Sequence, residues 1–254
     1  MKLNKSVLSV TLFGLLCLSG SSVMANEMKN DHIRFNFDER GISGIGSPND
    51  PFQAAVTNTR RPLSLTVQYQ VDDGDWQTLA LDQTQMQVQA DEGIIQYVSN
   101  DPQSPLKLVQ TFTMKKKGLD WDIEIETTSE KPIQIGNLAV NIPSVRPSGR
   151  TPEQIFENGF MPHQFISGNG SFIYYIRANG ASPFLMVTVK PGTHLEYFDN
   201  RGVYIHSGLS GGNETRGTWR QEHTFLDIPA KGSANSKVTY GFHFAFAQSY
   251  DLLR

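Results

Sequence analysis

Apolar side chains recur at every second position through most of this chain, and this period constrains the fold more than any other feature. In residues 63–71, leucine, valine and tyrosine share one face while serine, threonine and glutamine share the other. Residues 119–127 repeat the pattern with Trp121 among the apolar positions. Successive side chains of a β-strand point to opposite faces, so this period predicts strands with one buried face.

The same alternation predicts strands along the whole chain. They are residues 33–37, 41–45, 63–71, 76–81, 86–90, 94–99, 106–114 with a slip around Val109, 119–127, 133–142, 172–177, 184–189, 194–198, 203–206, 218–228 and 237–246. Only residues 152–157 suggest a turn of helix. So many strands without intervening helices predict an all-β protein, a large antiparallel two-sheet β-sandwich formed by residues 26–254.

The first 25 residues have the composition of a secretory signal peptide. Lys2 and Lys5 give a positive start, residues 7–18 are mostly apolar, and Val23 and Ala25 suit a cleavage site after Ala25. The apolar run is shorter than the roughly 20 residues that span a bilayer. We therefore expect an exported protein, periplasmic or secreted, with no membrane segment after the leader is removed. Cys17, the single cysteine, lies within the leader.

Composition and motifs argue against several classes of partner. The net charge is −3, and the longest basic run is the triplet of residues 115–117, so nucleic-acid binding has no electrostatic support. No cysteine and histidine spacing predicts a metal site, and the glycines at residues 168–170 lack the lysine of a phosphate loop. Asp120, Asp122, Glu124 and Glu126 form a row that diverges from any single point, which favours a solvated strand face over a metal site. We expect no cofactor and no metal.

Candidate binding residues concentrate in residues 157–198, where loops rich in Gly, Pro, Asn and His frame two strands. A sugar-binding surface needs aromatic rings with a few polar groups beside them. The candidates for carbohydrate binding are His163, Asn169, Tyr174, Tyr175, Arg177, Tyr197 and Trp219. The catalytic candidates are His163, as an acid or base, and Glu196.

Alternative catalytic sets remain open from the sequence. His194, His206 and His223 are further acid–base candidates with Glu222, and a hydrolase pair would come from Glu157, Glu196, Asp199 and Glu222. Each histidine is equally compatible with an ordinary hydrogen-bonded residue. Our hypothesis from the sequence is that the chain holds no complete active site.

Three stretches carry a family resemblance. They are residues 119–127 (LDWDIEIET) with 132–138 (PIQIGNL), residues 163–171 (HQFISGNGS), and residues 192–198 (GTHLEYF). Together they resemble the N-terminal β-sandwich of exported bacterial six-hairpin glycosidase-like proteins, a family long described as of unknown function. The resemblance covers residues 31–254. Asn137 departs from the family, in which an acid is expected between Gly136 and Leu138, so any role of that acid is in doubt here.

The resemblance implies a galactose-mutarotase-like supersandwich that precedes a helical (α/α)6 barrel. In such proteins the catalytic carboxylates usually lie on the barrel, and the sandwich lends loops to the substrate cleft. It therefore implies an accessory domain of a carbohydrate-active, glycoside hydrolase-like protein, with a carbohydrate and a helical catalytic domain, in cis or in trans, as partners. It also implies that this chain is the N-terminal part of a longer architecture. The alternatives are a self-sufficient sugar epimerase or lyase-like enzyme and a carbohydrate-binding module.

Overall fold

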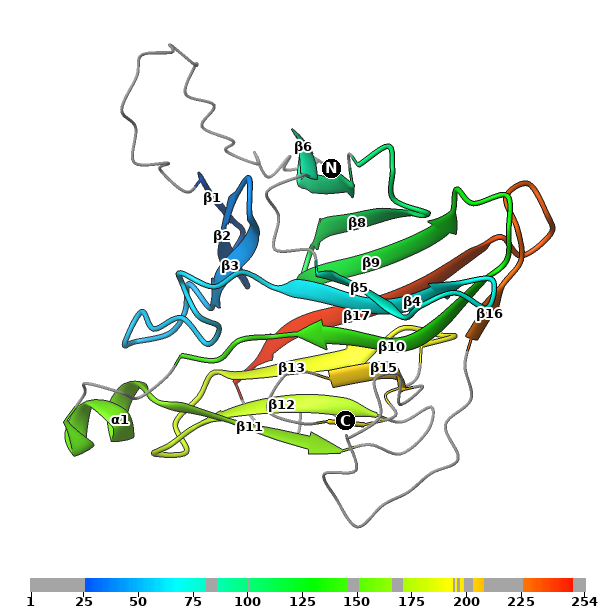
Figure 1. Ribbon diagram of the computed structural model, residues 1–254. Coiled ribbons are helices and arrows are strands. Elements are labelled where there is room, and N and C mark those ends of the chain that lie inside the picture. The colour runs from blue at the N-terminus through cyan, green and yellow to red at the C-terminus, as the bar shows by residue number, and fades with distance from the viewer. Residues whose placement is uncertain are drawn as a thin grey trace.

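The computed structural model describes residues 26–80, 86–99, 101–145, 151–165, 171–193, 195, 197–198, 203–207 and 226–248. The described strands form three antiparallel sheets (Figure 1). The largest has the order β11 (Phe160–Phe165), β12 (Phe172–Arg177), β13 (Phe184–Val189), β17 (Lys237–Ala247), β9 (Gly118–Thr127), β8 (Leu106–Lys115), β7 (Ile94–Ser99) and β6 (Met86–Asp91).

A six-stranded sheet packs across this large sheet. It has the order β14 (Tyr197–Phe198), β15 (Val203–Ser207), β10 (Ile133–Asn141), β4 (Ser64–Val71) and β5 (Gln77–Ala80), with β16 (Leu226–Ile228) also paired to β10. The third sheet, β1 (Asn26–Lys29), β2 (Arg34–Asp38) and β3 (Gly41–Gly46), lies at one end of the sandwich (Figure 1). The fold is therefore an all-β antiparallel sandwich, as the alternation predicts.

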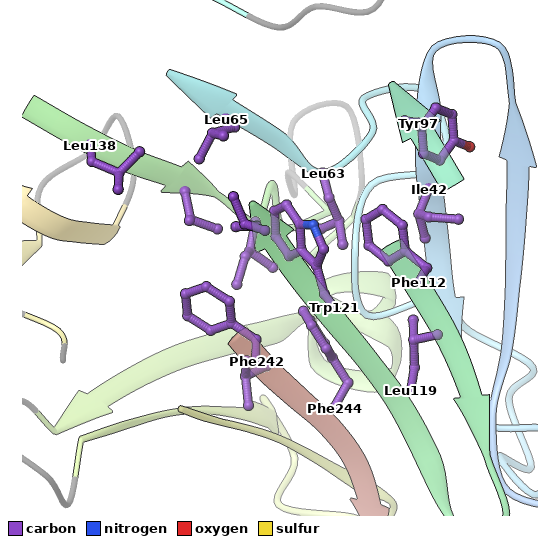
Figure 2. Packing of buried hydrophobic residues seen from close by; sticks show 14 of the residues in the cluster. Ile42, Leu63, Leu65, Tyr97, Phe112, Leu119, Trp121, Leu138, Phe242 and Phe244 are labelled. Carbon is purple, nitrogen blue, oxygen red and sulfur yellow. The ribbon is translucent and has the colours of Figure 1, made fainter. Parts of the chain in front are cut away.

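The core lies between the two larger sheets and is centred on Trp121. Its indole stacks on Phe112 with ring centroids 5.2 Å apart, and Phe242 lies 5.7 Å away on its neighbouring strand. Figure 2 shows Leu65 and Leu138, which belong to the six-stranded sheet, across the core from the strands that carry these aromatic rings. These side chains occupy the alternate positions of their strands, so burying them fixes which face of each sheet points outward.

One end of the sandwich is held by a buried ion pair. Arg177 of β12 is completely buried, and its Nη2 donates to Asp50 Oδ1 at 2.7 Å. Its guanidinium carbon lies over the Phe52 ring and over the Phe160 ring, 4.7 and 4.5 Å from their centroids. Its Nη1 donates to the Glu157 carbonyl at 2.7 Å, which ties α1 (Pro152–Asn158) to the sheet. Arg177 is thus an element of the core.

Most predicted strands agree with the observed ones to within a residue or two, and the predicted helical turn is α1. The predicted slip at Val109 is wrong, because β8 and β9 pair without interruption from Leu106 to Lys115. Gln110 is buried at an inward position. A polar residue among the apolar inward ones resembles a slip when only the sequence is seen. Two described strands, β1 and β11, were not predicted.

Candidate functional site

The face of the large sheet that points away from the core is polar along its central strands. On β9 the acidic residues alternate with the buried Leu119, Trp121, Ile123 and Ile125. The register with β17 places Asp120 opposite His243, Asp122 opposite Gly241 and Glu124 opposite Thr239. Directly opposed residues share a face in an antiparallel pair. The sheet order therefore gathers acidic, basic and hydroxyl groups on one surface.

A groove of about 490 Å³ opens on this surface. Its lining comes from Gln96 and Val98 of β7, Lys107, Val109 and Thr111 of β8, Asp122, Ile123 and Glu124 of β9, Thr239, Tyr240 and Gly241 of β17, and Lys190 and Pro191 after β13. Such a volume is within the range of small-molecule sites, and the mixture of polar and apolar lining is typical of them.

Lys190 bridges two carboxylates at one end of the groove. Its Nζ lies 2.9 Å from Asp120 Oδ2 and 2.7 Å from Asp122 Oδ1. On the far side of Asp120, Oδ1 lies 2.6 Å from His243 Nδ1. An ionised carboxylate only accepts hydrogen bonds, so Nδ1 donates this one when Asp120 is charged. The four side chains form one continuous polar network.

The network shifts the pKa of two of its members. Burial raises the pKa of the Asp120 carboxyl, but the hydrogen bonds and charges of His243 and Lys190 outweigh burial and leave this pKa below its ordinary value. For Lys190, burial lowers the pKa, yet the hydrogen bonds from its ammonium to Asp122 and Asp120 raise it above its ordinary value. Both groups are therefore held in their charged forms near neutral pH.

A glycine and a short turn position Lys190 over β17. The backbone N–H of Lys190 donates to the Gly241 carbonyl at 2.9 Å, and the Gly241 N–H donates to Thr193 Oγ1 at 2.8 Å. A Cβ at position 241 would lie 2.5 Å from Lys190 Cδ and 2.9 Å from Asp122 Oδ1. Only glycine leaves the space in which the lysine side chain crosses the strand toward Asp122.

A second ion pair borders the groove. Lys237 Nζ, at the start of β17, lies 2.6 Å from Glu124 Oε2. Glu126 is directly opposite Lys237 on one side and Lys107 of β8 on the other. The acidic row on β9 is therefore interleaved with lysines from both neighbouring strands, rather than simply solvated as its sequence predicts.

Two residues predicted from the sequence to bind carbohydrate lie in the core. Tyr175 is buried, and its hydroxyl donates to the Ile142 carbonyl at 3.3 Å. Arg177 is the buried partner of Asp50. Neither presents a surface to a ligand, because Tyr175 is buried against the segment after β10 and Arg177 against the loop after β3.

The remaining predicted site residues are not among the described residues that line the groove. Tyr174 points to the opposite face of β12 and packs 5.9 Å from the Phe184 ring, and it is also mostly buried. His163 lies in β11, opposite Tyr174 in register, and not in the loop that the sequence predicts. Tyr197 lies in the short strand β14, opposite Tyr204. Asn169, Glu196 and Trp219 lie outside the described residues, as do His194, His223, Asp199 and Glu222.

The polar network includes His243 and Lys190, which the alternation pattern does not mark as site residues. His243 and Asp120 are 123 residues apart in the chain, and only the adjacency of β17 and β9 brings them together. A signal was present, because Gly241 and His243 occupy outward positions that alternate with the core phenylalanines of β17. Its meaning depends on strand order, which alternation does not specify.

The described residues offer neither a metal-binding cluster nor a membrane-spanning helix. No group of three histidine, cysteine, aspartate or glutamate side chains there is arranged to hold a metal ion. Among the same residues, no helix is long and apolar enough to cross a membrane.

No protein-family model and no curated protein sequence matches this chain. Solved structures do share its fold. A polysaccharide lyase superposes with a TM-score of 0.63 at 12% identity, covering 86% of this chain and 32% of the lyase. A candidate aldose 1-epimerase from Escherichia coli K12 superposes with a TM-score of 0.51 at 8% identity, covering 89% of this chain and 99% of the epimerase.

A galactose mutarotase related enzyme from Lactobacillus acidophilus has a TM-score of 0.47 at 10% identity, covering 89% of this chain and 99% of that enzyme. The lyase and the epimerase define the class of fold, a galactose-mutarotase-like β-sandwich. The chain spans about a third of the length of the lyase, at 32%.

Proposed function

We propose that this chain is the carbohydrate-contacting β-sandwich of an exported polysaccharide-processing protein, and that it is not catalytic alone. The groove on the large sheet is the observation that carries the proposal. Asp122 and Glu124 accept hydrogen bonds, Lys190 and Lys107 donate them, and Thr111 and Thr239 do both. Val98, Val109 and Pro191 add apolar surface for the C–H groups of a sugar ring.

The accessory role rests on the resemblance to six-hairpin glycosidase-like proteins. In this proposal a helical (α/α)6 domain, in cis or in trans, supplies the catalytic carboxylates, and the sandwich holds part of the glycan. The small share of the polysaccharide lyase that the sandwich covers is in keeping with a domain of a larger protein. The composition of residues 1–25 supports export to the periplasm or the medium.

Glycan binding and turnover by residues 26–254 test this proposal together. We expect binding on a glycan array and no release of reducing ends from the polysaccharides that are bound. Lys190→Ala should weaken binding by about tenfold, because it removes a charged hydrogen-bond donor from the groove. Lys131→Ala, at an exposed ion pair with Asp72, is the control that should leave binding unchanged.

Two outcomes would contradict the proposal in different ways. Absence of glycan binding would remove the sugar-contacting role, whereas release of reducing ends by the purified chain would remove the accessory role. If turnover is seen, His163→Ala asks whether the histidine predicted from the sequence takes part in it.

A second candidate function, an aldose epimerase that works without a helical domain, rests on the His243–Asp120 pair. An imidazole held by a carboxylate on an accessible face is able to act as a general acid or base. Polarimetry of freshly dissolved α-glucose and α-galactose tests it. An equilibration rate above the uncatalysed one that is lost in His243→Gln supports the enzyme, and an uncatalysed rate excludes it for these sugars.

A further inference from the structure

We propose that the groove selects uncharged glycans over uronate-containing and amino-sugar glycans. This inference rests on the proposed carbohydrate-binding function and names the substrate class of the same site. Among the described residues, the charged side chains that line the groove are Lys107, Lys190, Asp122 and Glu124, two of each sign. The described lining of the groove therefore carries no net charge.

The charges next to the lining residues balance as well. Asp120 pairs with Lys190, and Lys237 pairs with Glu124. Glu126 lies opposite Lys107 in register, and Lys115 lies 3.7 Å from Asp120. The two lysines beside the lining, Lys115 and Lys237, are thus matched in number by two carboxylates, Asp120 and Glu126.

A uronate carboxylate is bound best by a cation whose N–H donors are not already paired with another carboxylate. This cation is most often an arginine that donates two hydrogen bonds. No arginine is among the described residues that line this groove. Lys190 already lies within 2.9 Å of two carboxylates, so a third carboxylate approaching it would face two like charges. An amino sugar has the converse difficulty, since Asp122 and Glu124 are each paired with a lysine.

Sugar hydroxyls fit this lining better than charged groups do. A hydroxyl donates to a carboxylate oxygen and accepts from an ammonium at the same time. A surface on which carboxylates and ammonium groups alternate can therefore bind neighbouring sugar hydroxyls. The ion pairs of the surface stay intact when it does so. Gln96, Thr111 and Thr239 extend the same choice of donor or acceptor along the groove.

The test is calorimetry of residues 26–254 with two sets of hexasaccharides at low and high salt. One set is built from glucose, mannose, xylose and galactose, and the other from galacturonate, mannuronate and glucosamine. We expect the tightest uncharged ligand to bind about tenfold or more tightly than any charged one, a difference of about 1.4 kcal/mol or more. Its affinity should also change little with salt, because no net charge is neutralised.

A single substitution that unbalances the charge sharpens the test. Glu124→Gln leaves Lys237 without its carboxylate, so binding of the galacturonate hexasaccharide should strengthen about two- to fivefold at low salt, and added salt should reverse the gain. Glu39→Gln is the matched control, since it makes the same change of charge in the turn between β2 and β3. It should leave uronate binding as in the unmodified chain.

The outcomes separate the inference from the function on which it rests. Binding of an uncharged hexasaccharide together with a uronate gain in Glu124→Gln supports both. Tighter binding of a uronate or amino-sugar ligand by the unmodified chain overturns the selectivity and leaves carbohydrate binding intact. Failure of both sets to bind overturns the carbohydrate-binding proposal and the selectivity with it.

Discussion

At the scale of single residues, two carboxylates hold charge where the fold admits little water. Asp50 is buried against Arg177, and its oxygens also accept the backbone N–H groups of Phe52 and Ala54 at 3.1 and 2.9 Å. Asp120 lies on the groove face between Lys190 and His243. The first carboxylate orders a loop over the end of the sandwich, and the second organises the groove.

Replacing Asp50 should show how far the buried pair holds that end of the fold. Asp50→Ala leaves the Arg177 guanidinium buried without its counter-ion, so we expect the free energy of unfolding to fall by about 3–5 kcal/mol. Urea denaturation measures it. Lys131→Ala, which breaks an exposed pair, should change this free energy by less than about 1 kcal/mol. A loss for Asp50→Ala as small as that of the control would contradict the prediction.

The lowered pKa of Asp120 predicts how acid affects stability. A carboxyl whose pKa is lower in the folded state stabilises the fold above its unfolded pKa of about 4, and that stabilisation is lost as the pH falls through the folded value. The difference in unfolding free energy between the unmodified chain and Asp120→Asn should therefore shrink from about pH 6 to about pH 3. Urea midpoints across this range measure it, with the exposed Asp72→Asn as control. A difference that widens in acid would refute the assignment.

At the scale of elements, β17 decides the character of the groove. Its odd-numbered positions lie on the groove side of the sheet and carry Thr239, Gly241 and His243, while its even-numbered positions carry the core phenylalanines and Tyr240, which also borders the groove. It pairs with β13 on one edge and β9 on the other. Lys190 and the acidic row meet across this one strand.

Gly241→Ala should force Lys190 away from its carboxylates. The added methyl group would lie 2.5 Å from Lys190 Cδ, and overpacking of this kind lowers the free energy of unfolding by about 1–3 kcal/mol. A double-mutant cycle with Lys190→Ala checks the cause, because removing the lysine side chain should recover much of the loss. Additive losses in the double variant would show that the methyl group strains something other than Lys190.

Alternation was sufficient to predict most strands and their inward faces, because burial of one face sets a period of two wherever a strand crosses the core. It failed for β11, where Pro162 suggested a loop. Proline lacks an N–H and is tolerated on edge strands, and β11 is the edge of its sheet. The short, exposed β1 has too few apolar residues for a pattern.

The groove was less predictable, since it depends on which strands are neighbours. The sequence predicts that Asp120, Asp122, Glu124 and Glu126 share a face, and they do. It does not contain the pairing of β9 with β17, whose ends are more than a hundred residues apart. Lys190 and His243 consequently appear in the sequence as isolated polar residues.

At the scale of the whole molecule, one continuous core joins all three sheets. Phe35 and Ile42 of the small sheet belong to the same buried cluster as Trp121 and Leu138 of the larger ones. The Tyr97 hydroxyl of β7 also donates to the Asp38 carbonyl of β2 at 2.9 Å. The small sheet is therefore part of the same folding unit and not an appendage.

This continuity predicts a single cooperative unfolding transition for residues 26–254. Tryptophan fluorescence includes the signal of Trp121 in the core beside those of Trp76 and Trp219, and far-ultraviolet circular dichroism reports on all strands. Their denaturation curves should coincide, as expected when one core holds every sheet. An earlier transition in circular dichroism alone would mean that a sheet separates before the core opens.

The turn that carries Lys190 has a kinetic consequence. The Lys190 N–H and the Thr193 hydroxyl both hydrogen-bond to Gly241, so the ammonium is in place before any sugar arrives. A binding surface that is already rigid spends little entropy on becoming ordered. Association measured by stopped flow should then be a single exponential whose rate rises linearly with glycan concentration, without the plateau that a slow rearrangement of the protein would impose.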